Sequence, residues 1–276
     1  MSAAERPEDR EERLNRIFRV LRFVLPLAIG AVLLFAWEYV VRAKDIPPYI
    51  LPGPVLIWKT LINDWTSLYP SLVNTLRLTV SALAVAIVGG VVLAVLFAQS
   101  KLIELSLFPY AVILQVTPIV AVAPLILIYV DDTSIALLVC AWIVAFFPIL
   151  SNTTLGLNSA DHNLVNLFQL YGATRWQTLR FLRLPAAMPY FLGGLRIAGG
   201  LALIGAVVAE FAAGAGGTAS GLAYRILEAG YRLNIPRMFA ALILISLAGI
   251  VIFAFFTLVT HLALRRWHES AMKREN

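Results

Sequence analysis

Apolar residues gather in six long runs, at 21–41, 73–98, 105–130, 133–155, 189–212 and 238–264. Each run has about 20 residues or more, which is the length of helix that crosses about 30 Å of hydrocarbon. Only Asp131 and Asp132 separate the third run from the fourth, so a tight polar turn joins them. The pattern predicts an all-α membrane protein with six transmembrane helices.

Several of the predicted spans contain proline. Pro109, Pro118, Pro124 and Pro148 are among these prolines. Proline breaks helices of soluble proteins. Within a membrane bundle it is tolerated, because neighbouring helices satisfy the backbone groups that it frees. We therefore expect the run 105–130 to form one span.

The composition also favours a membrane protein. Of the 276 residues, 60% are hydrophobic and 14% are charged, whereas a soluble domain carries about 25% charged residues. The one cysteine, Cys140, lies inside an apolar run, which excludes a disulfide framework. The net charge of +6 calls for no nucleic-acid partner, because the basic residues cluster beside the apolar runs.

Lysine and arginine indicate which side of the membrane each loop faces. Six spans place both termini on one side, which then holds fourteen basic residues against six opposite. The fourteen are Arg6, Arg10, Arg13, Arg16, Arg19, Arg22, Lys101, Arg175, Arg180, Arg183, Arg265, Arg266, Lys273 and Arg274, and the six are Arg42, Lys44, Lys59, Arg225, Arg232 and Arg237. Because basic residues favour the cytoplasmic side, we expect both termini and the loop 156–188 to be cytoplasmic.

This orientation divides the chain into three parts. Residues 1–20 form a basic cytoplasmic segment, residues 21–264 the transmembrane domain, and residues 265–276 a cytoplasmic tail. The first part fits either a solvated tail or a helix lying on anionic lipid. Outside, the segment 42–72 contains a short apolar stretch with tryptophans, which predicts a helix at the membrane interface. The glycine-rich stretch 214–217 indicates a flexible outer loop.

The cytoplasmic loop carries two helix signals. Asp161 is suited to cap a first helix, and Gly172 to end it in a left-handed conformation. Thr174 and Gln177 then have the spacing of a capping box, which starts a second helix. One face of the first helix is apolar, at Leu164, Leu167, Phe168 and Tyr171. Such a face fits either a connector resting on the membrane or an element that docks in a groove of a soluble partner.

The loop resembles the coupling-helix signature of binding-protein-dependent ABC importer permeases. That signature reads Glu-Ala-Ala, three residues, Gly, nine residues, Ile, one residue, Leu-Pro. Here Gly172 is followed by nine residues and then by Leu182-Arg183-Leu184-Pro185, and the flank Gly172-Ala173-Thr174-Arg175-Trp176-Gln177 also fits. The one departure replaces Glu-Ala-Ala by Asn166-Leu167-Phe168, which removes an acidic contact and favours a more hydrophobic dock. The resemblance extends over about residues 45–260. Within the family, the chain is similar to permeases of the sulfonate, taurine and nitrate type.

The resemblance implies a type I importer membrane domain in a bacterial inner membrane. Two copies would form the pathway, two cytoplasmic subunits would bind ATP and Mg, and an outer binding protein would deliver a small polar organic or anionic solute. The residues implied to contact the ATP-binding subunit are Leu167, Phe168, Gln169, Tyr171, Gly172, Ala173, Thr174, Arg175 and Trp176, with Leu184 and Pro185 as the structural end of the motif.

Polar residues inside the spans are the candidates for a pathway or gate. Gln115, Asn152 and Glu210 are such residues, although hydrogen bonds between helices explain them as well. Arg196 and Glu210 each lie towards an end of the fifth span, so we expect them to snorkel or to find a partner on another helix. Small residues at every fourth position, Gly194, Ala198, Ala202 and Ala206, predict close packing of that span against a helix.

The sequence offers no catalytic or cofactor site of its own. None of its 17 glycines is followed by lysine, which excludes a G-x-x-x-x-G-K phosphate loop. The three histidines lack metal-ligand spacing. We expect a non-enzymatic subunit without cofactors. A self-sufficient channel or secondary transporter and a membrane scaffold are the alternatives. The first would favour charged residues along the spans, and the second has no need of the glycine-to-Leu-Pro spacing.

Overall fold

The computed structural model describes residues 7–214 and 220–265, and these residues form helices without any strand. The helices are α1 (Pro7–Ala43), α2 (Pro54–Asn63), α3 (Trp65–Gln99), α4 (Lys101–Val116), α5 (Ile119–Tyr129), α6 (Thr133–Leu157), α7 (His162–Leu170), α8 (Arg175–Thr178), the π-helical turn η1 (Leu179–Arg183), α9 (Leu184–Ala213), α10 (Leu222–Tyr231) and α11 (Ile235–Leu264). Five of the six predicted spans correspond to one long helix each.

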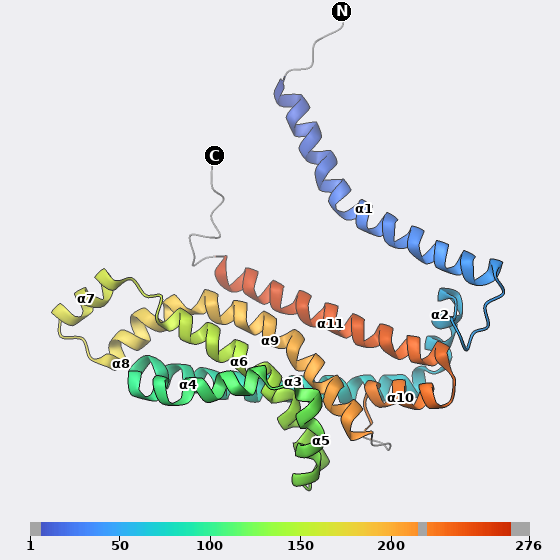
Figure 1. Cartoon of the computed structure of the whole chain (residues 1–276). Helices are drawn as coiled ribbons and strands as arrows, with labels where there is room; N and C mark the ends of the chain where they lie inside the picture. Colours follow the sequence, from blue (N-terminus) through green and yellow to red (C-terminus); the bar gives the residue numbers. More distant parts are fainter. Residues whose placement is uncertain (1–6, 215–219, 266–276) are drawn as a thin grey trace, which may run out of the picture.

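The long helices α3, α6, α9 and α11 lie along one another and form the body of the molecule (Figure 1). The closest approach is between α6 and α9. A Cβ atom at Gly194 would lie 2.8 Å from the Asn152 Cβ, and one at Gly205 would lie 2.9 Å from the Ala141 Cα. Ala198, Ala202 and Ala206 are fully buried. The predicted small-residue stripe is therefore confirmed, and its partners lie within the same chain.

Residues 105–130, which we expected to form one span, do not form one continuous helix. Helix α4 ends at Val116 and α5 begins at Ile119, with a bend of 103° between them. Pro118 has no N–H to continue the helical hydrogen bonds, and its ring excludes the residue before it from the helical region. Thr117 accordingly has ψ 122°. Figure 1 shows α5 pointing away from the long helices.

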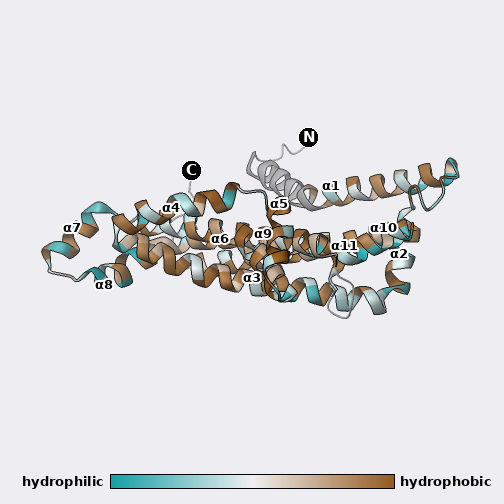
Figure 2. Cartoon of the chain, turned by 60° about the horizontal axis from the view of Figure 1, so that its bottom comes forward, coloured by the Kyte–Doolittle hydropathy of each residue, from teal (hydrophilic) through white to brown (hydrophobic). Residues whose placement is uncertain are grey.

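The bend affects the number of spans. Among the described residues, five helices are long and apolar enough to cross a membrane, and the number becomes six if α4 and α5 together form one broken span. Hydrophobic residues dominate the long helices, while α7 and α8 are more hydrophilic (Figure 2).

Helix α1 lies apart from the body along most of its length (Figure 1). Its side chains between Val24 and Ala43 are mostly exposed, and it meets the body through Trp37, whose ring centroid is 5.8 Å from that of Phe239 in α11. The helix starts at Pro7 and therefore runs without a break through the predicted boundary at residue 20. The side chains of the predicted segment 1–20 lie outside those that the structure describes, and the tail 266–276 lies outside the described residues.

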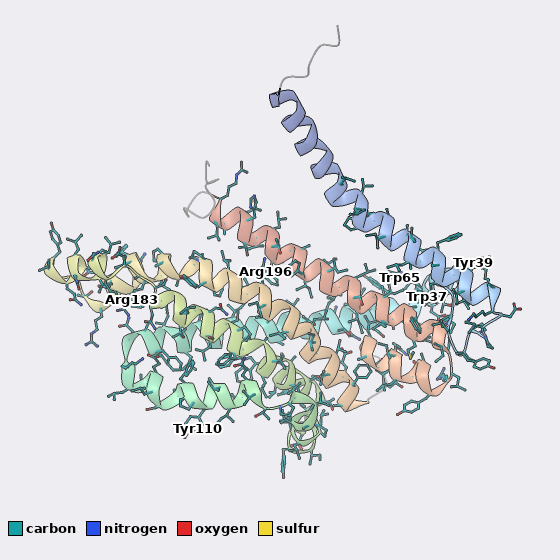
Figure 3. All side chains as sticks on the ribbon, turned by 45° about the horizontal axis from the view of Figure 1, so that its top comes forward. Trp37, Tyr39, Trp65, Tyr110, Arg183 and Arg196 are labelled. Atoms are coloured by element: carbon teal, nitrogen blue, oxygen red, sulfur yellow. The ribbon has the colours of Figure 1, made fainter. Side chains whose placement is uncertain are left out.

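The body has two distinct ends. At one end lie α7, α8 and Arg183, and at the other lie α2, α10 and the aromatic residues Trp37, Tyr39 and Trp65 (Figure 3). A short helix was predicted within the segment 42–72, and α2 is that helix. Helix α10 was not predicted. The stretch 214–217, for which a flexible loop was expected, lies outside the described residues except for Gly214. We call these two parts the α7 end and the α10 end.

Arg196 does not lie near the end of a span, contrary to expectation. The helical run extends from Arg175 to Ala213, and Arg196 is in its middle part (Figure 3). The guanidinium stacks over the Phe253 ring of α11 at 5.3 Å from the centroid. The expected alternative of a partner on another helix is therefore confirmed for Arg196, in the form of a cation–π contact.

Candidate functional site

The α7 end is built from strong local helix signals. The Asp161 carboxylate accepts a hydrogen bond from the Asn163 N–H at 2.7 Å and so caps α7. The helix ends at Gly172, whose φ of +71° is a conformation that glycine adopts without strain. There the Ala173 N–H donates to the Phe168 carbonyl at 2.9 Å. Both helix-end predictions are confirmed.

The second helix begins as predicted and continues further than expected. Thr174 and Gln177 form a complete capping box, with the Thr174 N–H donating to Gln177 Oε1 at 2.7 Å. Helix α8 then passes through η1 directly into α9, so that Pro185 lies in the first turn of α9. Because Pro185 has no N–H to donate, the upstream turn widens, and the Leu184 N–H donates to the Leu179 carbonyl. Helix α8, η1 and α9 therefore form one helical run without an intervening loop.

The residues from 162 to 178, which we call the docking segment, expose apolar side chains that no other part of the described chain covers. No residue of α7 or α8 is buried. Tyr171 is 84% exposed, Trp176 63% and Leu167 44%, while Phe168 is half-buried. Leu170, at 85% exposure, belongs to the same surface, although the motif did not single it out. Such clustered exposure is typical of an interaction surface.

Beneath the docking segment is a polar cavity of about 270 Å³. Gln169 and Arg175 line it from the docking segment, and Gln99 lines it from the end of α3. Arg183 also reaches it and donates through Nη1 to the Ala98 carbonyl at 2.9 Å. This hydrogen bond links the start of α9 to the end of α3. Two of the predicted contact residues, Gly172 and Thr174, shape the backbone. Leu184 and Pro185, predicted as the structural end of the motif, join the docking segment to the span.

Glu210 occupies a second site, at the α10 end. Its side chain is only 6% exposed and has partners from two other helices. Oε1 accepts from the Thr75 hydroxyl at 2.8 Å, and Oε2 accepts from the Ala223 N–H at 3.1 Å. The Thr75 hydroxyl in turn accepts from the Leu222 N–H at 2.9 Å. As expected, Glu210 has found a partner on another helix.

Gly221 makes this arrangement possible. The Glu210 carboxylate packs so closely against Gly221 that a Cβ atom there would overlap it. A larger residue would therefore displace either the carboxylate or the start of α10. No local sequence pattern could predict this arrangement, because Thr75, Glu210 and Ala223 are far apart in the sequence.

The two other pathway candidates lie elsewhere. Asn152 donates through Nδ2 to the Pro148 carbonyl of its own helix at 2.8 Å and packs beneath Gly194. Gln115 is exposed near the end of α4, next to the bend. Neither residue lines the cavity that Glu210 borders. The structure does not bring the three candidates together into one site.

Charged residues tie α10 to its neighbours. Glu228 forms ion pairs with Arg225 at 2.9 Å and Arg232 at 3.0 Å, and Arg237 of α11 lies 3.8 Å away. The hydrogen bond from Arg225 is the largest cause that holds the pKa of Glu228 below its ordinary value, and the charges of all three arginines act in the same direction. Arg225 also donates to the Ser71 hydroxyl of α3 at 2.9 Å.

Comparisons with known proteins agree with this architecture. The family model described as "Binding-protein-dependent transport system inner membrane component" matches residues 86–268. The chain is 32% identical to a probable ABC transporter permease protein of Haemophilus influenzae, over 82% of this chain and 90% of that protein.

Two further relatives have named solutes. The chain is 32% identical to the formylaminopyrimidine transport permease protein ThiX of Halalkalibacterium halodurans, over 83% of this chain and 90% of that protein. It is 30% identical to the taurine transport system permease protein TauC of Escherichia coli, over 87% and 86%. A crystal structure of an amino acid ABC transporter with histidines shares the fold, with a TM-score of 0.60 at 21% identity, over 74% of this chain and 96% of that chain.

Proposed function

Because the chain belongs to the family of binding-protein-dependent transport system inner membrane components, we propose that it forms the solute pathway of an ATP-driven importer and docks its ATPase through residues 162–178. The protein is a multi-pass protein of the inner membrane and an ABC transporter permease. Permeases of such importers work with ATPase subunits and with a substrate-binding protein.

The observation that carries this proposal is the form of the docking segment. It exposes Leu170, Tyr171 and Trp176, yet its backbone is fixed by the cap at Asp161, the turn at Gly172 and the capping box. A rigid helix that offers apolar side chains fits helix-in-groove recognition. A connector resting on lipid would not need this rigid backbone.

The connection to the spans suggests how the force is transmitted. Closure of two ATPase subunits around ATP and Mg would move the docking segment, and α8 would pass this movement into α9 without an intervening loop. The bundle would then alternate between inward-open and outward-open states. Nucleotide needs only to favour one of the two states to drive this change.

We further propose six spans, with α4 and α5 together forming the third, and two copies of the chain around one pathway. Both termini and the docking segment would then be cytoplasmic, which agrees with the larger number of basic residues on that side. The α10 end would face the binding protein.

Gln115 and Asn152 remain polar positions for a pathway, and Glu210 is a candidate gate next to the outer cavity. The solute would be a small polar organic molecule or anion.

The experiment that tests the proposal is co-purification of the ATPase subunit, followed by measurement of ATP hydrolysis in nanodiscs. Gly172→Val forces a β-branched residue into a left-handed conformation, whereas Gly172→Asn introduces a side chain that tolerates it. Neither side chain meets a neighbour within 4 Å at its Cβ. We expect the valine variant to lose the ATPase or its stimulation, and the asparagine variant to retain both. Recovery of no ATPase with the native chain, or equal behaviour of the two variants, contradicts docking through this segment.

A further inference from the structure

A cavity of about 570 Å³ opens at the α10 end, between α3, α6, α9 and α10. This volume lies within the range of sites that hold small organic ligands. Leu78, Ile135 and Leu138 provide an apolar wall, while Ser81, Ser134 and Tyr224 provide hydroxyl groups. Such a mixture of an apolar wall and a few polar groups is typical of a binding site rather than of a packing defect.

Arg77 is the cationic residue that lines this cavity. It immediately precedes residues 78–99 of α3, a stretch without any charge, and it lies within the candidate span Trp65–Gln99. Its side chain is exposed, and the described part of the chain gives its guanidinium no hydrogen bond and no carboxylate within 4 Å. An ionisable residue at such a depth normally has a partner or a function, because an uncompensated charge there is costly.

The acidic residue of the cavity does not neutralise Arg77. Glu210 borders the same space, but its two oxygens accept hydrogen bonds from Thr75 and Ala223. Because Glu210 is also only 6% exposed, a cation entering the cavity would have little access to its carboxylate. An anion would find five N–H donors of Arg77 without acceptors. The cavity is thus arranged for a negative charge.

We propose that this cavity binds a small organic anion, with a carboxylate or sulfonate group on Arg77 and an apolar body against Leu78, Ile135 and Leu138. Ser81 and Tyr224 are the neutral donors available to the remaining oxygens. The planar guanidinium favours these oxyanions because it can donate two parallel hydrogen bonds. The assignment rests on the proposed import function for its biological role and specifies the class of solute.

The test uses a cysteine placed one helical turn from Arg77. Ser81 is exposed and lies at i+4 on the same face of α3, while the native Cys140 is buried, so the parent chain is the blank. The Ser81→Cys variant in nanodiscs is treated with two thiol reagents of similar size, the anionic sulfonatoethyl and the cationic trimethylammonioethyl methanethiosulfonate. We expect the anionic reagent to react faster, and the ratio of the two rates to fall about tenfold on Arg77→Gln.

Two controls isolate the effect of the arginine. Arg77→Lys keeps the charge and should keep the preference, which also shows that the site folds. Arg196→Gln removes the same charge from a residue that does not line the cavity and should leave the ratio unchanged.

Protection of the cysteine by a bound compound is a second measurement. Benzenesulfonate should protect the introduced cysteine, and the neutral benzenesulfonamide should not.

An unchanged ratio in Arg77→Gln, equal protection by both compounds, or a cysteine that reacts with neither reagent overturns the anion site. Co-purification of the ATPase with the same variants distinguishes this failure from failure of the import function. If the ATPase is retained without a charge preference, only the anion site is wrong. If the charge preference is retained and no ATPase is recovered, only the proposed importer is wrong.

Discussion

The two ends of the bundle differ in whether their side chains find contacts within the chain. At the α10 end, Glu210, Thr75 and the start of α10 are joined by buried hydrogen bonds, and Glu228 holds arginines from α10 and α11. At the α7 end, Tyr171 and Trp176 project with no cover from the described chain. The buried polar groups of the α10 end have partners in their own chain, while we propose that the α7 end is covered by a partner. A change at the first end should therefore reduce stability, and a change at the second should reduce association.

The largest effect on stability is expected from Gly221→Val. The added side chain would overlap the Glu210 carboxylate and separate it from the Thr75 hydroxyl and the Ala223 N–H. Overpacking and the lost hydrogen bonds together should destabilise the fold by about 2–4 kcal/mol. Thermal unfolding of the purified protein measures this. Gly193→Val is the matched control, because its Cβ meets nothing within 4 Å. Equal losses in the two variants would show that Glu210 does not hold α10.

A smaller effect is expected where the docking segment joins the body. Arg183→Gln removes the charged donor to the Ala98 carbonyl, a hydrogen bond that joins the start of α9 to the end of α3. We expect a loss of about 1–2 kcal/mol, since hydrogen bonds of charged groups are worth more than neutral ones and this one is half-buried. Arg180→Gln, at an exposed neighbouring position stacked on Phe181, is the control in the same unfolding measurement. A loss of the same size in both variants argues against a specific link.

The smallest effect concerns pH at the α10 end. The pKa of Glu228 is lower in the folded protein than in the unfolded chain, so its ion pairs stabilise the fold above the unfolded pKa, near 4.3. That stability is lost as the pH falls through the lower folded pKa. Unfolding between pH 3 and pH 7 should show a dependence of about 1 kcal/mol or less, reduced in Glu228→Gln. A variant with the same pH profile as the native protein would show that these pairs contribute nothing.

The sequence predicted the α7 end well because its signals are local. Asp161, Gly172 and the pair Thr174 and Gln177 act within a few residues, and each determines its helix end independently of the remaining fold. The Glu210 constellation joins residues 135 positions apart, so no window along the chain contains it. Helix α10 was not predicted because its buried residues Leu222, Ala223 and Ala229 lie among charged residues in a short segment.

The prolines also show that local sequence does not determine where a helix bends. Pro109, Pro124 and Pro148 lie inside helices, and only Pro118 of the four coincides with the 103° bend. All four remove one backbone donor, so the residue type alone does not distinguish them. The difference lies in whether neighbouring helices hold the chain straight, which is a property of packing.

The most direct test of docking at the α7 end compares two tyrosines with the same exposure. Tyr171 is 84% exposed at the α7 end, and Tyr231 is 86% exposed at the α10 end. The affinity of the ATPase subunit should be measured for Tyr171→Ala and Tyr231→Ala in nanodiscs. An aromatic anchor at an interface contributes about 2 kcal/mol or more. We therefore predict at least tenfold weaker binding for Tyr171→Ala and unchanged binding for Tyr231→Ala. Equal affinities for the two variants, or weaker binding only for Tyr231→Ala, would contradict docking through the α7 end.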